Sequence, residues 1–380
     1  MFGPRGTGKS TFLTQFFSGA NVLWIDLLSP EIERRYALHP DELTHQVNAM
    51  ARKPEWIVID EVQKVPALLD VVHHLIESQK IKFGLTGSSA RKLKLGGANL
   101  LAGRAFVNYI FPLTAFEMAN AFDLNTALRW GTLPKITQFE SDEERLEFLQ
   151  AYAHTYLKEE IMSEQLVRKI DPFRRFLEIS SQSNGSILNY SNISRDVGAD
   201  TKTVQNYYEI LQDTMVGFFL EPFHQSIRKQ QRQSPKFYWF DLGVKRALDR
   251  TLGQSLEEST YGYGNAFEHF LITEIHRLSL YQKRDYRLYY LRTKNQLEID
   301  LILDRPGMPL ALIEIKSTRH TTENDSRSIR SLISEFSRAE GYVLSLDPLE
   351  KKIDSIWFLP WHKGLEALGL SIKKVKRFPL

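Results

Sequence analysis

A short stretch near the start of the chain has the residue types and spacing of a phosphate-binding loop. The stretch GPRGTGKST, from Gly3 to Thr11, fits the pattern G-x-x-x-x-G-K-[ST]. Glycines let backbone N–H groups curl around phosphates, and the following helix would turn its positive end toward them. Lys9 is expected to neutralise the β- and γ-phosphates of ATP, and Ser10 to place its hydroxyl on Mg²⁺. The residues expected to contact the nucleotide here are Gly3, Pro4, Arg5, Gly6, Thr7, Gly8, Lys9, Ser10 and Thr11.

An acidic pair supplies the partner that such a loop needs. In EWIVIDEVQ, the apolar run Trp56–Ile59 is typical of a strand buried on both faces of a parallel sheet, and it ends in Asp60 and Glu61. Open α/β sheets bind ligands at this end of their strands. Asp60 is expected to hold the Mg²⁺ shell and Glu61 to polarise the attacking water. Solvated carboxylates that cap a strand are the alternative, but the loop favours a site of nucleotide hydrolysis.

A second buried strand, KFGLTGSS, ends in Thr86 and Ser88, which could sense the γ-phosphate. Arg91 and Arg104 follow it, and either could act as an arginine finger within the chain or across a subunit contact. Arg104 is favoured because it follows the glycine-rich stretch LGGANLLAG. A surface arginine that pairs with a carboxylate is the alternative for each.

The last third contains a second set of charged residues with chemical potential. The strand-like runs QLEIDLILD and LALIEIKST are joined by the turn sequence RPGMP. Counting across this connection places Asp300 opposite Glu314 and Glu298 opposite Lys316, all on one face because side chains alternate along a strand. The other face carries the apolar residues expected to pack into the core, namely Leu297, Ile299, Leu301, Ile313 and Ile315.

Two carboxylates that face each other repel unless a cation lies between them. A Mg²⁺ or Mn²⁺ ion held by Asp300 and Glu314 would remove that repulsion, since such ions prefer oxygen ligands. Glu268, on the preceding helix, could add a ligand, and Lys316 would hold or help deprotonate an attacking water. Ordinary salt bridges of Lys316 with Glu298 or Glu314 are the alternative.

The middle of the chain is mostly helical. Residues 141–165 are expected to form a lid or linker beside the nucleotide. The stretch LNYSNISRDVGADTKTVQNYYEILQDT has the layout of a helix-turn-helix in which Gly198 ends the first helix, and VGFFLEPF and KFYWFDLG would be the strands of a wing. A winged helix used as a lid or a protein contact competes with DNA binding. Contacts with DNA would come from Lys202, Thr203, Gln205, Asn206, Arg228, Lys229 and Arg232.

Six strings together carry a resemblance to a known family: GPRGTGKST, WIVIDEVQKVP, LTGSSARKL, GGANLLAGRA, FPLTAFE and YLKEEI. They resemble the bacterial and archaeal ATPases of the AAA superfamily that have a C-terminal domain of unknown function 4143, over residues 1 to about 336. The resemblance implies an ATPase of the additional-strand, catalytic-glutamate class, a winged helix and a nuclease-like C-terminal domain. The spacing Asp300-x13-Glu314-Ile315-Lys316 is in turn similar to the PD-(D/E)XK nuclease core, whose role is phosphodiester cleavage with bound metal ions.

The expected fold is α/β: a P-loop NTPase parallel sheet with helices on both faces at 1–140, a helical lid and winged helix-turn-helix at 141–255, and a PD-(D/E)XK nuclease-like domain at 256–380. Cysteine is absent, which fits a reducing cytoplasm. No apolar run reaches the roughly 18 residues of a membrane helix and no signal peptide is recognisable, so no membrane is expected as a partner. A net charge of +3 allows contact with nucleic acid without arguing for it.

Only Met1 and Phe2 precede the loop, although a P-loop starts from the end of a central strand. We expect a short apolar strand upstream of the printed start; without it, nucleotide binding should be weaker and the C-terminal site the main seat of function. Two functions remain: an ATPase coupled to DNA binding or cleavage, and a nucleotide-gated switch whose later domains bind a protein partner or a second copy without catalysis.

Overall fold

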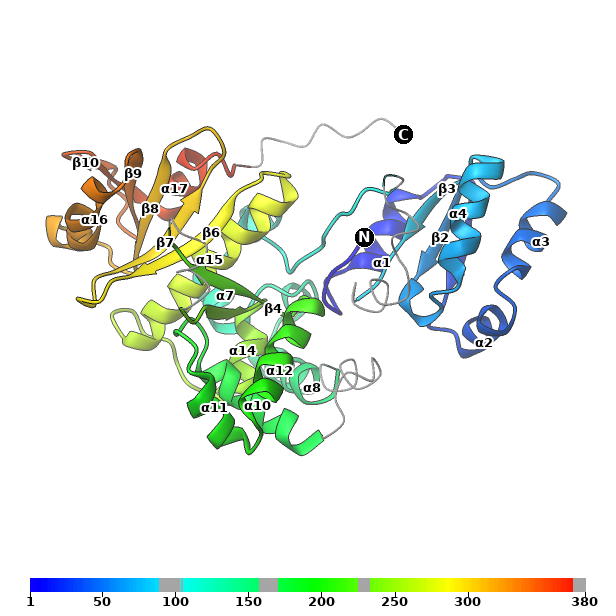
Figure 1. Ribbon diagram of the computed structural model, residues 1–380, viewed down its shortest axis with the longest axis horizontal. Coiled ribbons are helices and arrows are strands. Elements are labelled where there is room, and N and C mark those ends of the chain that lie inside the picture. Colours follow the sequence, from blue (N-terminus) through cyan, green and yellow to red (C-terminus); the bar gives the residue numbers. More distant parts are fainter. Residues whose placement is uncertain (89–102, 104, 157–169, 225–232, 372–380) are drawn as a thin grey trace. The chain divides into compact units, whose positions relative to one another are not determined.

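The computed structural model describes residues 1–88, 103, 105–156, 170–224 and 233–371 (Figure 1). The chain divides into two compact units, one built mainly from Met1–Phe111 and the other mainly from the residues after Phe111. The first unit has a three-stranded sheet in which all strands are parallel, and the second has a mixed, eight-stranded sheet. The chain is therefore an α/β protein, as the sequence predicted.

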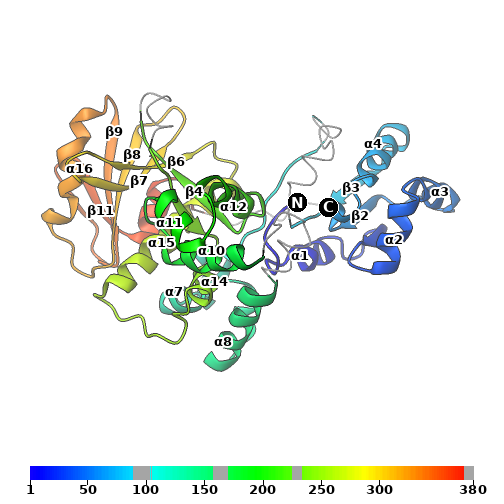
Figure 2. The ribbon, with the colours of Figure 1, turned by 60° about the horizontal axis from the view of Figure 1, so that its bottom comes forward.

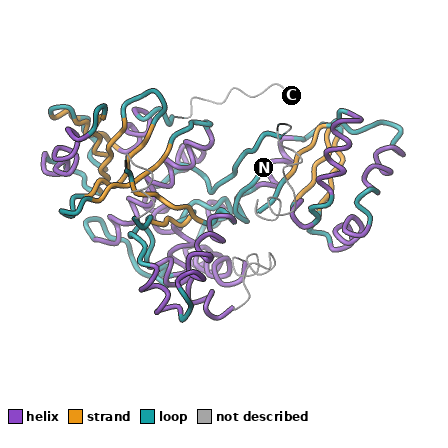
Figure 3. The backbone as a smooth tube through the Cα atoms, viewed as in Figure 1, coloured by secondary structure: helices purple, strands orange, loops and turns teal. Residues whose placement is uncertain are grey.

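The first unit is a parallel sheet with helices on both faces (Figure 3). On one face, α1 packs through Leu13, with Phe17 just after its end, against Val58 of the central strand. The other face is covered by α2, α3 and α4 through a larger apolar cluster. The elements are α1 (Lys9–Phe16), β1 (Val22–Asp26), α2 (Pro30–Leu38), α3 (Glu42–Ala49), β2 (Trp56–Asp60), η1 (Val62–Lys64), α4 (Leu68–Gln79) and β3 (Lys82–Leu85), and the strand order is β1-β2-β3.

The residue just before the loop is paired with other backbone on both of its sides. Phe2 forms parallel bridges to Gly87 on one side and to Tyr109 on the other. Its N–H donates to the carbonyl oxygen of Asn108 at 2.9 Å, and its own carbonyl oxygen accepts from the N–H of Ile110 at 2.8 Å. The backbone that leads into the loop is therefore paired on both sides, which fixes the start of the loop.

The helices of the second unit are α6 (Ala115–Met118), η3 (Ala119–Ala121), α7 (Leu124–Trp130), η4 (Ile136–Gln138), α8 (Asp142–Ala151), η5 (Tyr152–Tyr156), α10 (Ile170–Gln182), α11 (Tyr190–Val197), α12 (Thr201–Asp213), α14 (Leu242–Leu248), α15 (Tyr261–Tyr281), η6 (Glu323–Ser326), α16 (Arg327–Leu332), η7 (Ile333–Glu335) and α17 (Trp361–Ala367). Its strands are β4 (Gly217–Pro222), β5 (Lys236–Trp239), β6 (Arg287–Arg292), β7 (Glu298–Asp304), β8 (Leu310–Lys316), β9 (Ala339–Ser345), β10 (Lys351–Ile353) and β11 (Ile356–Pro360).

The predicted winged helix is present as α10, α11 and α12 followed by β4 and β5. Gly198 follows α11 with a φ of 73°, as expected for the residue that ends a helix in the left-handed region. The two wing strands also belong to the large sheet, since β4 pairs in parallel with β6 and the strand order is β10-β11-β9-β8-β7-β6-β4-β5. The middle and last thirds of the chain therefore share one sheet.

Strands β7 and β8 pair in the predicted register. Leu301 lies opposite Ile313. Toward the connecting turn, Ile302 lies opposite Leu312 and Leu303 opposite Ala311. The next position along each strand is occupied by Asp300 and Glu314. Counting across the short turn is sufficient here because the turn fixes the register.

The pairing of β7 with β6 contains a bulge that the sequence did not reveal. The register shifts by one residue between Tyr289 and Leu291. Asp300 and Leu301 together therefore face Tyr290, and a β-bulge of this kind bends the strand and redirects its side chains. The pairs on the two sides of the shift are Arg287–Asp304, Leu288–Leu303 and Tyr289–Ile302, then Leu291–Ile299 and Arg292–Glu298.

The bulge changes which side chains share a face, so part of the predicted apolar face is wrong. Leu301 and Ile313 pack with α15 and α17. Ile299 instead packs in the same cluster as Ile302, on the side covered by α16, and Leu297 lies against that cluster too (Figure 2). Strict alternation fails because the strand has one extra residue at the bulge.

Candidate functional site

The phosphate-binding loop has the backbone geometry that its sequence requires. Gly6 and Gly8 have φ values of 77° and 88°, which non-glycine residues rarely adopt. The amine of Lys9 is buried and donates to the carbonyl oxygens of Gly3 at 2.8 Å and Pro4 at 3.1 Å. No side chain caps the N-terminus of α1. The first N–H groups of the helix therefore remain available to a ligand in the loop.

The acidic residue of β2 joins the loop to the next strand. The hydroxyl of Ser10 donates to Asp60 Oδ2 at 2.6 Å, and the hydroxyl of Thr86 donates to Asp60 Oδ1. The N–H of Glu61 in turn donates to the Thr86 oxygen at 3.2 Å. The structure therefore brings together Ser10, Asp60 and Thr86, which lie far apart in the sequence. Hydroxyl and carboxylate oxygens are ligands that Mg²⁺ prefers, so this set fits that ion.

Glu61 is held in a defined position beside them. Its φ of 58° lies in the left-handed region. Its Oε2 accepts from the N–H and the hydroxyl of Ser88, both at 3.3 Å, and from the amide of Gln63. Gln63 also donates to the Ser88 hydroxyl at 3.1 Å. Sequence reasoning missed Gln63, although its place two residues after Glu61 would have been a signal. Arg91 and Arg104, the predicted arginine fingers, lie outside the described residues.

In the second unit, Lys316 lies between the two predicted metal-binding carboxylates. Its amine is 2.7 Å from Glu314 Oε2 and 3.8 Å from Asp300 Oδ2. Asp300 Oδ2 also accepts from the backbone N–H of Ile315 at 2.8 Å. Among the described residues, the other oxygen of Glu314, Oε1, is buried without a hydrogen-bond partner, although the hydroxyl of Ser328 lies near enough to the carboxyl group to lower its pKa. A buried carboxylate oxygen of this kind fits the role of a cation ligand.

Burial and crowding of like charges shift the protonation of this site. Burial, together with the charge of Asp300, raises the pKa of Glu314 to about 8 and the pKa of Glu268 to about 7. Burial alone would lower the pKa of Lys316, but Asp300 and Glu314 outweigh it and raise that pKa. The lysine therefore stays charged beside Glu314, whose carboxyl group holds its proton more strongly than usual.

Two further residues of the site were missed from the sequence. The hydroxyl of Tyr238 donates to Glu268 Oε1 at 2.7 Å, and the amine of Lys236 lies 3.8 Å from the same oxygen. Lys236 also lies 2.6 Å from Glu298 Oε1. Burial lowers the pKa of Lys236, but Glu268 and then Glu298 raise it by more. Of the two salt bridges expected as the alternative, Lys316 forms the one with Glu314 at 2.7 Å. Glu298 pairs instead with Lys236 and, at 3.8 Å, with Arg292.

Within the residues described, no three histidine, aspartate or glutamate side chains gather closely enough to hold a metal ion by themselves. Asp300 and Glu314 fit a divalent cation as a pair of oxygen ligands, with Glu268 close enough to raise the pKa of Lys316 by its charge. The set is therefore a charged pair with a third carboxylate nearby rather than a closed metal cage.

The helix expected to read DNA carries few features for that task. Lys202 and Gln205 on α12 are exposed, and Thr203 and Asn206 are half-buried. The hydroxyl of Thr203 is used to donate to Asp200 Oδ2 at 2.6 Å, which places a carboxylate at the start of the helix. Such a negative charge repels phosphates. The predicted wing-tip residues Arg228, Lys229 and Arg232 lie outside the described residues.

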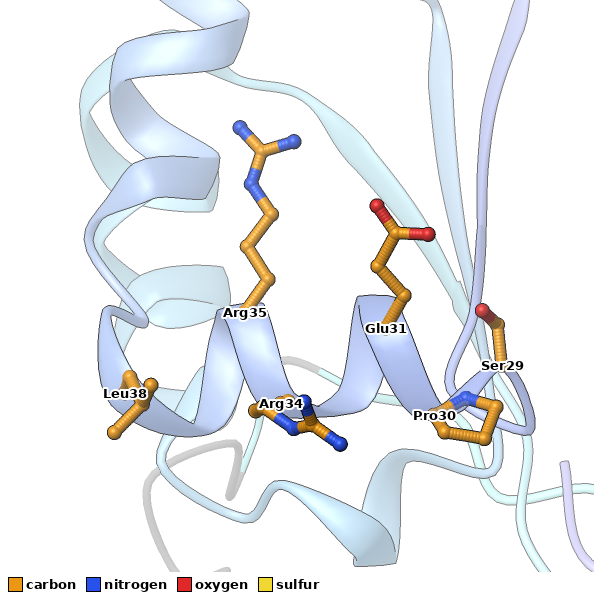
Figure 4. A pocket seen from close by; sticks show the side chains of 6 residues that line it. All are labelled: Ser29, Pro30, Glu31, Arg34, Arg35 and Leu38. Atoms are coloured by element: carbon orange, nitrogen blue, oxygen red, sulfur yellow. The ribbon is translucent and has the colours of Figure 1, made fainter.

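A shallow pocket occurs elsewhere in the first unit, on α2 (Figure 4). It contains none of the predicted site residues, and Arg35 in it is paired with Glu42. Its lining is Ser29, Pro30, Glu31, Arg34, Arg35 and Leu38.

In the described part of the chain, no helix combines the length and apolar character needed to cross a membrane.

Comparison with known proteins yields relatives that align with most of this chain. An uncharacterised protein of Mycobacterium tuberculosis is 27% identical over 342 residues, which cover 89% of this chain and 74% of that protein. One of Methanocaldococcus jannaschii is 21% identical, with 95% of this chain and 87% of that protein covered. Can2 from Sulfobacillus thermosulfidooxidans, solved with cyclic tetra-adenylate, aligns over 92% of this chain and 98% of its own at 10% identity; its TM-score of 0.20 is too low to support an argument.

Family models match three consecutive parts of the chain. Residues 1–119 match an AAA domain, residues 121–256 a domain of unknown function (DUF8612), and residues 263–363 another domain of unknown function (DUF4143). The loop, Asp60, Glu61 and Thr86 fall in the first part, whereas Glu268 and Lys316 fall in the third. The chain thus has an AAA domain at its N-terminus and domain of unknown function 4143 toward its C-terminus, the combination that its sequence motifs predicted.

Proposed function

We propose that this protein binds ATP and hydrolyses it with Mg²⁺. The observation that carries the proposal is the convergence of Ser10, Asp60 and Thr86 at the carboxyl end of β2, beside the phosphate-binding loop. The match of residues 1–119 to an AAA domain supports it, since that domain indicates nucleotide binding.

Each residue of the site has a role in this proposal. Lys9 leaves the loop carbonyls and binds the phosphate oxygens, and the first N–H groups of α1 bind the same phosphates. Ser10 and Asp60 hold Mg²⁺, which neutralises phosphate charge when it is bound. Glu61 accepts a hydrogen bond from the attacking water. Thr86 and Ser88 sense the γ-phosphate by donating hydrogen bonds to it when it is bound.

The test compares Lys9→Ala and Glu61→Gln with the wild type. Lys9→Ala should weaken ATP binding by about 100-fold or more, because the buried charge contacts phosphate directly. Glu61→Gln should keep the affinity and lower the hydrolysis rate by about 100-fold or more. The exposed Lys82, which pairs with Glu55, offers the control Lys82→Ala. Unchanged ATP affinity in Lys9→Ala would refute the proposal.

We further propose that the second unit cleaves phosphodiester bonds of DNA with a divalent cation. Asp300 and Glu314 hold the cation, and the unpartnered Glu314 Oε1 is the observation that supports this role. A bound Mg²⁺ or Mn²⁺ would polarise the phosphate and lower the pKa of a water. Lys316, released from Glu314, donates a hydrogen bond that orients that water.

One observation favours a second candidate, a nucleotide-gated switch that binds a partner without cleavage. The amine of Lys316 already neutralises Glu314 at 2.7 Å, so the carboxylates have a counter-ion of their own. The two candidates differ in a nuclease assay with Mn²⁺ or Mg²⁺ on single- and double-stranded DNA. Cleavage that is lost in Lys316→Ala and kept in Lys351→Ala, a lysine paired with Asp347, supports the nuclease. Absence of cleavage in the wild type supports the switch.

A further inference from the structure

Two phenylalanines on α1 form an exposed apolar surface beside the phosphate-binding loop. Phe12 and Phe16 are 50% and 45% exposed. They lie four residues apart on one face of the helix, and their rings stack with centroids 6.0 Å apart and an angle of 18° between their planes. Exposed apolar side chains that gather in one place mark a binding surface more often than isolated ones do.

This surface is attached to the core of the first unit. The ring of Phe16 meets that of Phe17 edge to face at 5.0 Å, and the ring of Phe17 packs against Trp56 at 5.1 Å. Leu13 and Phe17 hold the buried side of α1 against Val58 of the central strand. The exposed rings therefore have a fixed support before a ligand binds, which lowers the entropy cost of stacking on them.

The position of Phe12 relative to Ser10 indicates which part of a nucleotide it meets. The N–H of Phe12 donates to the carbonyl oxygen of Gly8 at 2.8 Å, so Phe12 belongs to the first turn of α1, where the phosphates bind. Ser10 bonds to Asp60, on the side of Mg²⁺ and of the β- and γ-phosphates in the proposed site. Two residues span about 200° around a helix, so Phe12 lies on the opposite flank from Ser10.

In the proposed site, the nucleotide leaves the loop on the flank of Phe12. The terminal phosphates occupy the flank of Ser10, and the α-phosphate, the ribose and the base follow across the N-terminus of the helix. Side chains of a helix lean toward its N-terminus, so the ring of Phe12 covers the turn that the α-phosphate contacts. The base, one ribose farther along, then meets the surface that Phe12 and Phe16 form.

We propose that Phe12 and Phe16 are the base-binding surface of the nucleotide site and stack on the purine ring. This inference rests on the proposed ATP site of the first unit and adds how that site holds the base. Stacking on an aromatic side chain strengthens binding by about tenfold, and it does not depend on the identity of the base because every base has a π-face. The surface therefore stacks on guanine as well as on adenine.

Equilibrium binding of ATP, GTP and inorganic tripolyphosphate to the whole chain, each with Mg²⁺, tests the inference. Phe12→Ala should weaken binding of ATP and of GTP by about tenfold, and Phe16→Ala should weaken both by less, because its ring supports that of Phe12. Tripolyphosphate should bind both variants as tightly as the wild type, because it has no base. Phe12→Trp keeps an aromatic ring and should keep the affinity for ATP. Tyr261→Ala is the control, since Tyr261 is 84% exposed and lies on α15 of the second unit.

The tripolyphosphate measurement separates contacts with the base from contacts with the phosphates. Equal losses of affinity for ATP and for tripolyphosphate in Phe12→Ala would mean that the ring supports the loop, and would overturn the inference. ATP affinity that is unchanged in both alanine variants would also overturn it, and a simultaneous change in sedimentation would assign the surface to contact with a second copy of the chain. A wild-type protein that binds neither ATP nor tripolyphosphate would overturn the proposed nucleotide site and the inference together.

Discussion

Gln63 shows how one residue can hold another in position. Its amide donates both to Glu61 and to the hydroxyl of Ser88, which itself donates to Glu61. The carboxylate is therefore fixed by a small network before any water is bound, and a side chain at Gly87 would collide with the amide oxygen of Gln63. Gln63 is thus a positioning residue for the proposed hydrolysis.

We expect Gln63→Ala to lower kcat of ATP hydrolysis by about tenfold while the Kd for ATP stays unchanged, because the loss of one or two hydrogen bonds costs about 1–2 kcal/mol in orientation. Single-turnover hydrolysis and equilibrium nucleotide binding measure the two quantities. Gln79→Ala is the control, since Gln79 bonds to Asn48 on the surface. A change in Kd without a change in kcat would contradict a positioning role.

Glu274 is a buried carboxyl outside both sites, on α15. Its Oε2 accepts from the N–H of Ala115 at 3.1 Å, Arg277 lies 3.6 Å away, and burial raises its pKa to about 7. Because the folded pKa is above the ordinary value of 4.5, the protonated form stabilises the fold. That stabilisation is complete below pH 4.5 and is lost as the pH rises through 7.

The expected size of this effect is on the order of 3 kcal/mol between pH 4.5 and pH 7. In Glu274→Gln the group no longer titrates, so the free energy of unfolding should fall less over that window than in the wild type. Urea unfolding at several pH values measures the difference. Parallel pH profiles for the two proteins would show that Glu274 is not the titrating group.

At the scale of elements, the helix-turn-helix depends on the backbone where α11 ends. Gly198 has a φ of 73°. Gly264 lies within α15, where an added Cβ would be 3.5 Å from the hydroxyl of Ser317, an ordinary contact. The same substitution should therefore have opposite effects at the two positions.

Gly198→Ala should destabilise the protein by about 1 kcal/mol, because a β-carbon is strained in the left-handed region. Gly264→Ala should stabilise it by about 0.5–1 kcal/mol, because alanine loses less backbone entropy in a helix. Chemical denaturation of both variants measures the difference. Equal effects of the two substitutions would rule out backbone conformation as the cause.

The elements also show what the sequence could and could not predict. The loop, the acidic pair and the register of β7 with β8 were predictable, because each follows from short spacings along the chain. The bulge at Asp300 was not, since it arises from pairing with β6 and breaks the alternation on which counting relies. Lys236 was missed for a similar reason: its partner Glu298 is distant in sequence, and its burial depends on tertiary packing.

At the scale of the whole molecule, the sheet joins parts of the chain that the sequence analysis treated as separate. The wing strands β4 and β5 continue the sheet of β6 to β11, and Leu220 of β4 lies in the same apolar cluster as Leu301 of β7. The middle and last thirds therefore share both hydrogen bonds and a core.

We expect a fragment of residues 256–380 to lack cooperative unfolding, because it exposes the edge of β6 and the apolar face that β4 covers. A fragment of residues 112–380 keeps both and should unfold cooperatively. Circular dichroism during urea titration distinguishes the two fragments. Cooperative unfolding of the shorter fragment would mean that the wing strands are dispensable for folding.

The pairing of Phe2 on both sides has a practical consequence for anyone who produces this protein. The N-terminal amine donates to the carbonyl oxygen of Leu85 at 2.6 Å, and the local direction is parallel to β3. Any residues ahead of Met1, whether natural or added by an expression vector, start alongside β3, an edge strand of the described three-stranded sheet. An affinity tag is therefore not neutral here: a charged leader and a short apolar one place different side chains against the base of the nucleotide site.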